Sequence, residues 1–143
     1  MTDHWTLSDD AFLQSIQTRT LPATAFTHEA HLRLAFICLE QAPLSEASEQ
    51  VCALIRQFAA ANGAPDKFHL TLTLACVQVV AHFMTRMPGG SFAALMEAFP
   101  AMKTDMPDLL HRHYRPERLA LKEGKTAYIA PDLLLFAPAL PIV

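Results

Sequence analysis

The sequence predicts an all-α protein: a compact up-and-down helical bundle with short accessory helices and an extended C-terminal arm. Apolar residues recur every three or four positions through most of the chain, which is the period of a helix with one buried face. Capping residues, prolines and glycines divide this pattern into segments joined by short loops, as in a bundle. The stretch 129–143 carries three prolines and cannot form one regular helix.

Two helices are predicted in the first third of the chain. Ser8 is a favoured N-cap, and two aspartates follow it where the helix macrodipole favours negative charge, so we expect a helix over 8–18. Thr27 is the natural N-cap of a second helix, which we expect to run to Gln41 and to end before Pro43.

Two longer helices are predicted next. The third lies between Ser45 as N-cap and Gly63 as C-terminal stop. The following segment is ambiguous, because 67–74 alternates apolar and polar residues as a strand does. However, 67–87 contains neither Gly nor Pro, and no other segment before residue 126 offers a sheet partner. We therefore expect a long, mostly buried helix over 67–87.

The rest of the chain predicts small elements. Short helices are expected over 92–99, 107–114 and 117–123, and the apolar arm 129–143 is expected to be extended. Because the length suits one ordinary domain, we interpret 1–143 as a single helical domain.

Composition disfavours several classes of partner and location. The net charge is −3 and the sequence pI is about 6.1, so no general field would attract nucleic acid or an anionic membrane. Three cysteines sit in apolar stretches, which indicates reduced core thiols and a cytoplasmic protein. The N-terminus lacks the pattern of a signal peptide, and polar residues interrupt the most apolar stretch, so neither export nor a membrane span is expected.

The predicted topology brings three histidines together. Short connections make the second, third and fourth helices antiparallel neighbours, so the second and fourth helices begin at the same end of the bundle. His28 and His31 fall on the apolar side of the first turns of the second helix, and His69 falls in the first turn of the fourth. Three residues of that second helix fall on the opposite, polar side: Glu29, Arg33 and Glu40.

Three converging imidazoles suit two kinds of chemistry. They could bind one divalent transition metal, namely zinc, iron, nickel or copper, and leave a position open for substrate. Without metal, they could bind an anion or act as acid and base. Asp66 is placed to orient one ring or to complete a metal shell. A third interpretation is that the histidines only hydrogen-bond at helix ends.

The other candidate groups are interpreted as structural. Four histidines are expected outside the site: His4 in an unstructured start, His82 on another stripe of its helix, and the diverging His111 and His113. Cys38 and Cys76 follow His31 and His69 by seven residues; we interpret them as core thiols, with a redox pair as the alternative. The basic run over 112–125 is interpreted as a solvated face, with an anion site as the alternative.

Two short elements carry a resemblance. Phe26, His28, His31 and Leu32 form F-x-H-x-x-H-L, and His69 opens the later H-x-T-x-T over 69–73. In these elements the chain resembles an uncharacterised group of small bacterial all-helical proteins. The resemblance covers about the first two-thirds of the chain and implies that the two elements belong together, but it implies no reaction.

The leading prediction is a small metal-dependent or histidine acid/base enzyme that acts on a small molecule through His28, His31 and His69. The alternative is a non-catalytic protein, either a small-ligand binder or a homodimeric interaction protein, in which these histidines are structural. The arm 129–143 is expected to wrap the bundle, to reach a second subunit, or to cover the ligand pocket, and the sequence leaves these three open.

Overall fold

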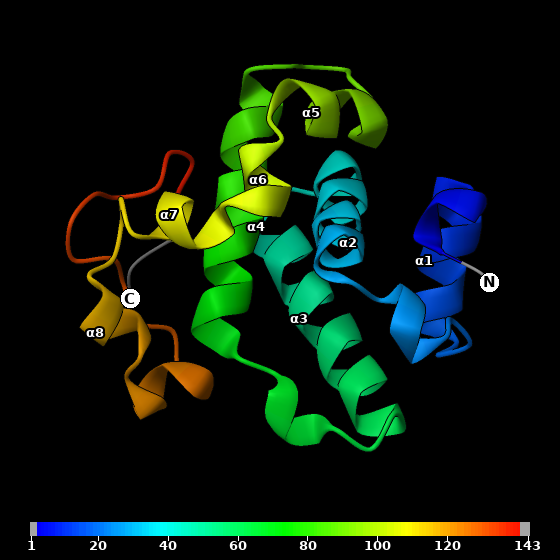
Figure 1. Cartoon of the computed structure of the whole chain (residues 1–143), viewed down its shortest axis with the longest axis horizontal. Coiled ribbons are helices and arrows are strands. Elements are labelled where there is room, and N and C mark those ends of the chain that lie inside the picture. Colours follow the sequence, from blue (N-terminus) through cyan, green and yellow to red (C-terminus); the bar gives the residue numbers. More distant parts are fainter. Residues whose placement is uncertain (1–2, 141–143) are drawn as a thin grey trace.

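The computed structural model describes residues 3–140, and within them it contains eight α-helices, four short 3-10 helices and no β-strand. The all-α prediction is confirmed. The four helices nearest the N-terminus are α1 (Asp9–Gln17), α2 (His28–Gln41), α3 (Leu44–Ala61) and α4 (Leu70–Thr85). Helix α1 lies at one end of the molecule, and the C-terminal arm lies at the other (Figure 1).

The starts of α1 and α2 follow from their caps. The Ser8 hydroxyl accepts a hydrogen bond from the Ala11 amide at 3.1 Å, and the Thr27 hydroxyl accepts one from the Ala30 amide at 3.2 Å. Each side chain thus satisfies one backbone donor that has no partner inside the helix. Both predicted helices are confirmed to within a residue or so at each end.

The predicted starts of α3 and α4 need correction. Helix α3 begins after Pro43, so Ser45 lies inside its first turn and does not cap it. Helix α4 begins at Leu70, and the preceding chain forms the short 3-10 helix η3 (Pro65–Lys67). His69 is therefore the N-cap of α4 with extended backbone, and not a residue of its first turn. The proline at position 65 explains the shorter helix, because it sets up a separate turn.

Helices α2, α3 and α4 pack against one another and form the centre of the molecule. Helices α2 and α4 run in the same direction, and α3, which lies between them in the sequence, runs in the opposite direction, as the short loops predict (Figure 1). Buried side chains from all three belong to one apolar core, which includes Leu32, Val51 and Val80. Within residues 3–140, no helix is long and apolar enough to cross a bilayer.

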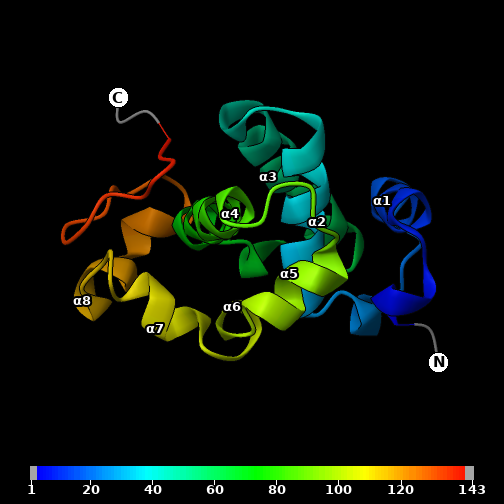
Figure 2. The same ribbon diagram turned by 90° about the horizontal axis from the view of Figure 1, so that it is seen from above.

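A row of short helices covers one side of α2 and α4 (Figure 2). The row consists of α5 (Phe92–Ala98), α6 (Ala101–Thr104), α7 (Met106–Leu110) and α8 (Pro116–Leu119). Helix α5 begins at its Ser91 cap as predicted, whereas α6 was not predicted, and α7 and α8 are shorter than expected. Prolines at the starts of α6, α7 and α8 explain why these three helices are so short.

The C-terminal arm lies partly along α4 without regular structure up to residue 140; residues 141–143 lie outside the described part. The Thr71 hydroxyl donates to the Ala127 carbonyl and accepts from the Ile129 amide, and the Gln78 side chain accepts from the Leu140 amide. Phe136 is buried, but the leucines at 133–135 are about half exposed. The arm therefore covers apolar surface at some positions and exposes it at others.

Candidate functional site

A pocket of about 590 Å³ opens between α2, α3, α4 and the α6–α7 segment, and all three predicted histidines line it. Its size is typical of a small-molecule site. We call it the histidine pocket; its walls are His28, His31, Leu32, Ala35, Val51, Ile55, Lys67, Phe68, His69, Leu72, Thr73, Cys76, Val77, Lys103, Met106, Pro107 and Leu110. The three histidines line one pocket, as the predicted topology requires, while their role as a site stays a prediction.

His31 is held with one ring nitrogen available. Its Nδ1 lies 2.7 Å from the Thr27 carbonyl, which can only accept, so Nδ1 carries the proton and Nε2 has the lone pair. The ring stacks on Phe26 at a centroid distance of 3.9 Å, and Phe26 packs edge-on against Phe58. Burial lowers the pKa of His31, and the nearby His28 lowers it further, against the opposing effect of the Thr27 carbonyl. His31 is thus a neutral ring with an available base.

His69 has the opposite arrangement. Its Nδ1 accepts a hydrogen bond from the Leu72 amide at 3.1 Å and caps α4. The neutral ring therefore carries its proton on Nε2 and can donate it to a ligand. Burial lowers the pKa of His69, and the charge of Lys125 lowers it further, so the neutral form is favoured.

His28 is the most exposed of the three rings. Its Nε2 donates to the Met102 carbonyl at 3.0 Å and ties the start of α2 to α6. Its Nδ1 is then the ring nitrogen with a lone pair. Among the described residues 3–140, no three His, Cys, Asp or Glu side chains are placed to hold one metal ion. The three rings instead form part of the lining of a pocket of about 590 Å³.

A metal ion would also disturb the His69 cap. A neutral imidazole that binds a metal through Nε2 must carry its proton on Nδ1. In His69 that nitrogen accepts from the Leu72 amide, so metal binding would put two N–H groups against each other. Metal binding through Nε2 of His69 would therefore require the N-terminal cap of α4 to rearrange.

Cys76 lines the pocket as an inert thiol. Burial raises its pKa to about 12, so the nucleophilic thiolate is not populated near neutral pH. Cys38 is buried and does not line the pocket, and both side chains are free thiols. Asp66, which the sequence placed near His69, is exposed and does not line the pocket either.

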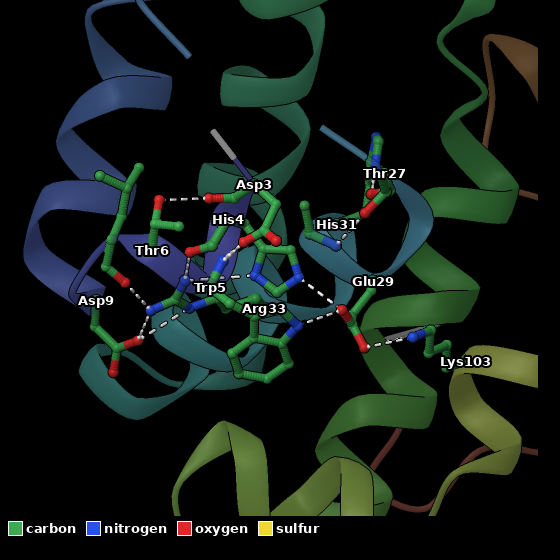
Figure 3. Close-up of polar contacts among 12 residues, drawn as sticks. Asp3, His4, Trp5, Thr6, Asp9, Thr27, Glu29, His31, Arg33 and Lys103 are labelled. Carbon is green, nitrogen blue, oxygen red and sulfur yellow. Dashed lines mark hydrogen bonds and ion pairs between the residues drawn. The ribbon is translucent and has the colours of Figure 1, made fainter. Parts of the chain in front are cut away.

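A polar network that ends at Lys103, one of the pocket-lining residues, is centred on His4 (Figure 3). The expectation of an unstructured start is wrong, because His4 is buried in the short helix η1 (His4–Thr6). Its Nε2 and the Trp5 indole nitrogen each lie 2.7 Å from the same carboxylate oxygen of Glu29. Arg33 approaches His4 Nδ1 at 3.4 Å, and since arginine only donates, the His4 proton lies on Nε2 and points to Glu29.

Arg33 does not line the histidine pocket, in agreement with its predicted place on the opposite side of α2, but it is buried there. Only 5% of its surface is exposed, and it donates to the backbone carbonyls of His4 and Leu7 and to the Asp9 carboxylate. Segment 3–7 covers this side of α2, which the periodicity of α2 alone cannot show. The buried guanidinium is therefore paired on several sides.

Glu29 connects this network to Lys103. The Lys103 ammonium lies 3.1 Å from the second Glu29 oxygen. Burial raises the pKa of Glu29, but hydrogen bonds from His4, Lys103 and Trp5 outweigh it, so that pKa lies below its usual value. Glu29 does not line the histidine pocket, which agrees with its predicted place on the side of α2 opposite His28 and His31.

Sequence reasoning missed Lys67 and Lys103, the two lysines of the pocket. No local pattern marks Lys103, because α6 reaches the pocket only through the packing of the short-helix row. Two other histidines bond to the arm instead: His82 to the Ala137 carbonyl and His113 to the Leu134 carbonyl. Neither lines the pocket, in agreement with the prediction that both lie outside the site.

Comparison with known proteins gives no match: no family model, no curated protein and no solved structure is similar to this chain.

Proposed function

We propose that this protein is a small-molecule acid/base enzyme, in which His31 removes a proton from a molecule bound in the histidine pocket and His69 donates a hydrogen bond to it. The observation that carries the proposal is the opposite state of the two rings. One has its Nδ1 proton bound to the Thr27 carbonyl, and the other has its Nδ1 lone pair bound to the Leu72 amide. A base and a hydrogen-bond donor that share one pocket are the parts that proton transfer needs.

The reaction class that suits this pair is proton removal beside a carbonyl group. The C–H bond breaks, its proton goes to His31 Nε2, and its electron pair forms a C=C bond while the π pair of the carbonyl moves onto the oxygen. His69 Nε2–H would stabilise that oxygen as it becomes negative. The lowered pKa of His31 keeps the base in its active, neutral form near neutral pH. Apolar walls such as Leu32 and Val77 support the proposal, because they strengthen such electrostatic contacts by excluding water.

The experiment measures deuterium incorporation. Small ketones, namely cyclohexanone, 2-butanone and phenylacetone, are incubated with the protein in D₂O, and loss of the C–H signals beside the carbonyl is followed by NMR. We expect His31→Gln to slow incorporation by about a hundredfold or more, as for loss of a general base. His82→Gln is the matched control, because that ring lies outside the pocket.

Two results would contradict the proposal. One is incorporation no faster than with free imidazole at the same concentration. The other is an enzyme rate that His31→Gln leaves unchanged. A rate that falls as the pH drops through the range where His31 gains its proton would support the assignment of this residue as the base.

A second candidate function is non-catalytic ligand binding, which is favoured by the bonds that His28 and His69 already make to Met102 and Leu72. In that case histidine variants lower the melting temperature and ligands bind without turnover. The metal-dependent form of the prediction has a separate test. Stoichiometric metal in untagged protein purified without chelator, lost in His28→Ala or His69→Ala, would replace the acid/base proposal.

A further inference from the structure

The histidine pocket has a one-sided charge. Lys67 and Lys103 line it together with three histidines, whereas no Asp or Glu of the described chain does so. This is not a consequence of composition, because the whole sequence has 14 acidic residues against 11 lysines and arginines. A concave site lined by charges of one sign concentrates ligands of the opposite sign. The pocket therefore favours an anion.

Lys103 is the better placed of the two lysines. It lines both the histidine pocket and a smaller adjoining cavity of about 330 Å³, and His28 is the other residue that lines both. The Lys103 ammonium uses one contact on Glu29 and is about half exposed, so further donors remain for a ligand. Glu29 in turn is fixed by His4 and Trp5 (Figure 3). The His4 network thus positions a cation in the pocket lining.

The inner wall of the pocket is apolar. Four of its residues are almost fully buried: Leu32, Ala35, Val51 and Val77. Such a wall gains free energy from contact with a hydrocarbon body and offers no partner for a second charged group. A ligand that is charged along its whole length would not fit this wall.

We propose that the ligand of this pocket is an amphipathic carboxylate, with one anionic head at Lys103 and Lys67 and an apolar body against the inner wall. The inference rests on the proposed function in that both place a small molecule in the same pocket. Lys103 is then a specificity-determining residue, and Glu29 is a positioning residue that holds it.

The test compares three probes of equal chain length: octanoate, 1-octanol and octylammonium. Binding to the full chain is measured by calorimetry, and the histidine ring signals are followed by NMR. We expect octanoate to bind about tenfold or more tightly than the other two, as one charge-assisted contact allows. It is expected to shift the ring signals of His31 and His69 but not that of His82, which lies outside the pocket.

Variants identify the anion contact. We expect Lys103→Met to weaken octanoate binding by about tenfold and to leave 1-octanol binding unchanged, with Lys103→Arg restoring the preference. Lys122→Met is the matched control, since Lys122 is exposed and does not line the pocket. The retained 1-octanol binding shows that a variant still folds.

Three outcomes overturn this inference. They are 1-octanol binding as tightly as octanoate, an octanoate affinity that Lys103→Met leaves unchanged, and NMR shifts confined to histidine rings outside the pocket. The inference and the proposed function fail separately. Octanoate binding as expected, with no deuterium incorporation into any ketone, would contradict only the proposed enzymatic function. Incorporation into neutral ketones, without preferential binding of octanoate, would contradict only the proposed carboxylate ligand.

Discussion

Single side chains set the hydrogen-bonding state of each ring in the histidine pocket. Phe26 stacks on His31, and the Thr27 residue between them caps α2 with its hydroxyl and holds the His31 proton with its carbonyl. In the second element, the Thr73 hydroxyl donates to the His69 carbonyl. The residues of F-x-H-x-x-H-L and H-x-T-x-T thus have local structural roles that position the two rings.

The cap formed by His69 predicts a measurable loss of stability. Replacing His69 by Ala leaves the Leu72 amide without its acceptor and is expected to cost about 1 kcal/mol of unfolding free energy. His69→Asn retains a side-chain acceptor at the N-cap and is expected to recover most of that loss. Urea unfolding followed by circular dichroism measures both. Equal stability of the Ala and Asn variants would show that the cap contributes nothing.

The same cap makes stability depend on pH. Burial lowers the pKa of His69, so the unfolded chain, with a histidine pKa near about 6.5, takes up the proton before the folded chain does. The stabilising contribution is therefore complete above about pH 6.5 and is lost as the pH falls from there through the lower folded pKa. His69→Asn does not titrate, and its unfolding free energy is expected to fall less than that of the wild type over this window.

At the scale of elements, segment 3–7 depends on one arginine of α2. Arg33 donates to the carbonyls of His4 and Leu7, while the Trp5 ring stacks on Phe92 of α5 at a centroid distance of 5.5 Å. Few apolar side chains of this segment reach the core, so its position depends mainly on polar contacts. Removing the guanidinium leaves buried carbonyls without a donor.

Arg33→Ala is therefore expected to cost about 2 to 3 kcal/mol of unfolding free energy and to release segment 3–7. Trp5 is the one tryptophan of the chain, so its fluorescence reports the release directly. Asp9→Asn is the matched control: Asp9 is half exposed and Arg33 keeps its carbonyl partners, so less than about 1 kcal/mol is expected. Unchanged Trp5 emission in Arg33→Ala would contradict this view of the segment.

The start of α4 shows why a strand-like pattern belongs to a helix. Leu72 lines the histidine pocket, Thr71 binds the arm, and Val77 and Val80 enter the core. A helix with neighbours on several sides carries apolar residues at positions that no single stripe explains. The length of the segment without Gly or Pro predicted its structure better than its alternation did.

In the whole molecule, the arm adds one aromatic side chain, Phe136, to the apolar core. Phe136 is 4% exposed and stacks on His113 at 4.0 Å, and its neighbours on the chain at 133–135 are about half exposed. The arm therefore contributes to stability at Phe136 far more than its exposed leucines do.

Phe136→Ala is expected to cost about 3 to 5 kcal/mol of unfolding free energy, because it leaves a cavity in the core. Leu134→Ala, which removes an exposed side chain two residues away, is expected to stay within about 0.5 kcal/mol. Chemical denaturation of both variants gives the comparison. A Phe136→Ala protein as stable as Leu134→Ala would mean that the arm does not belong to the core.

Features that depend on interactions between residues close in the sequence could be predicted from the sequence. Helical periodicity and side-chain caps act within a few residues, so the all-α class and the starts of α1, α2 and α5 could be predicted from the chain. Short loops also determined the relative direction of α2, α3 and α4, and with it the meeting of His28, His31 and His69.

Only the tertiary structure decided which groups surround those rings. The burial of His4 and Arg33, the Glu29–Lys103 pair and the approach of α6 to the pocket join residues at least 24 positions apart. Such contacts depend on how whole helices and segments pack. The residues that form them follow no periodic pattern or regular spacing that could be recognised in the sequence. The hydrogen bond from the Leu72 amide to His69 joins residues only three positions apart. It forms because η3 ends before His69, which leaves His69 at the N-cap position of α4.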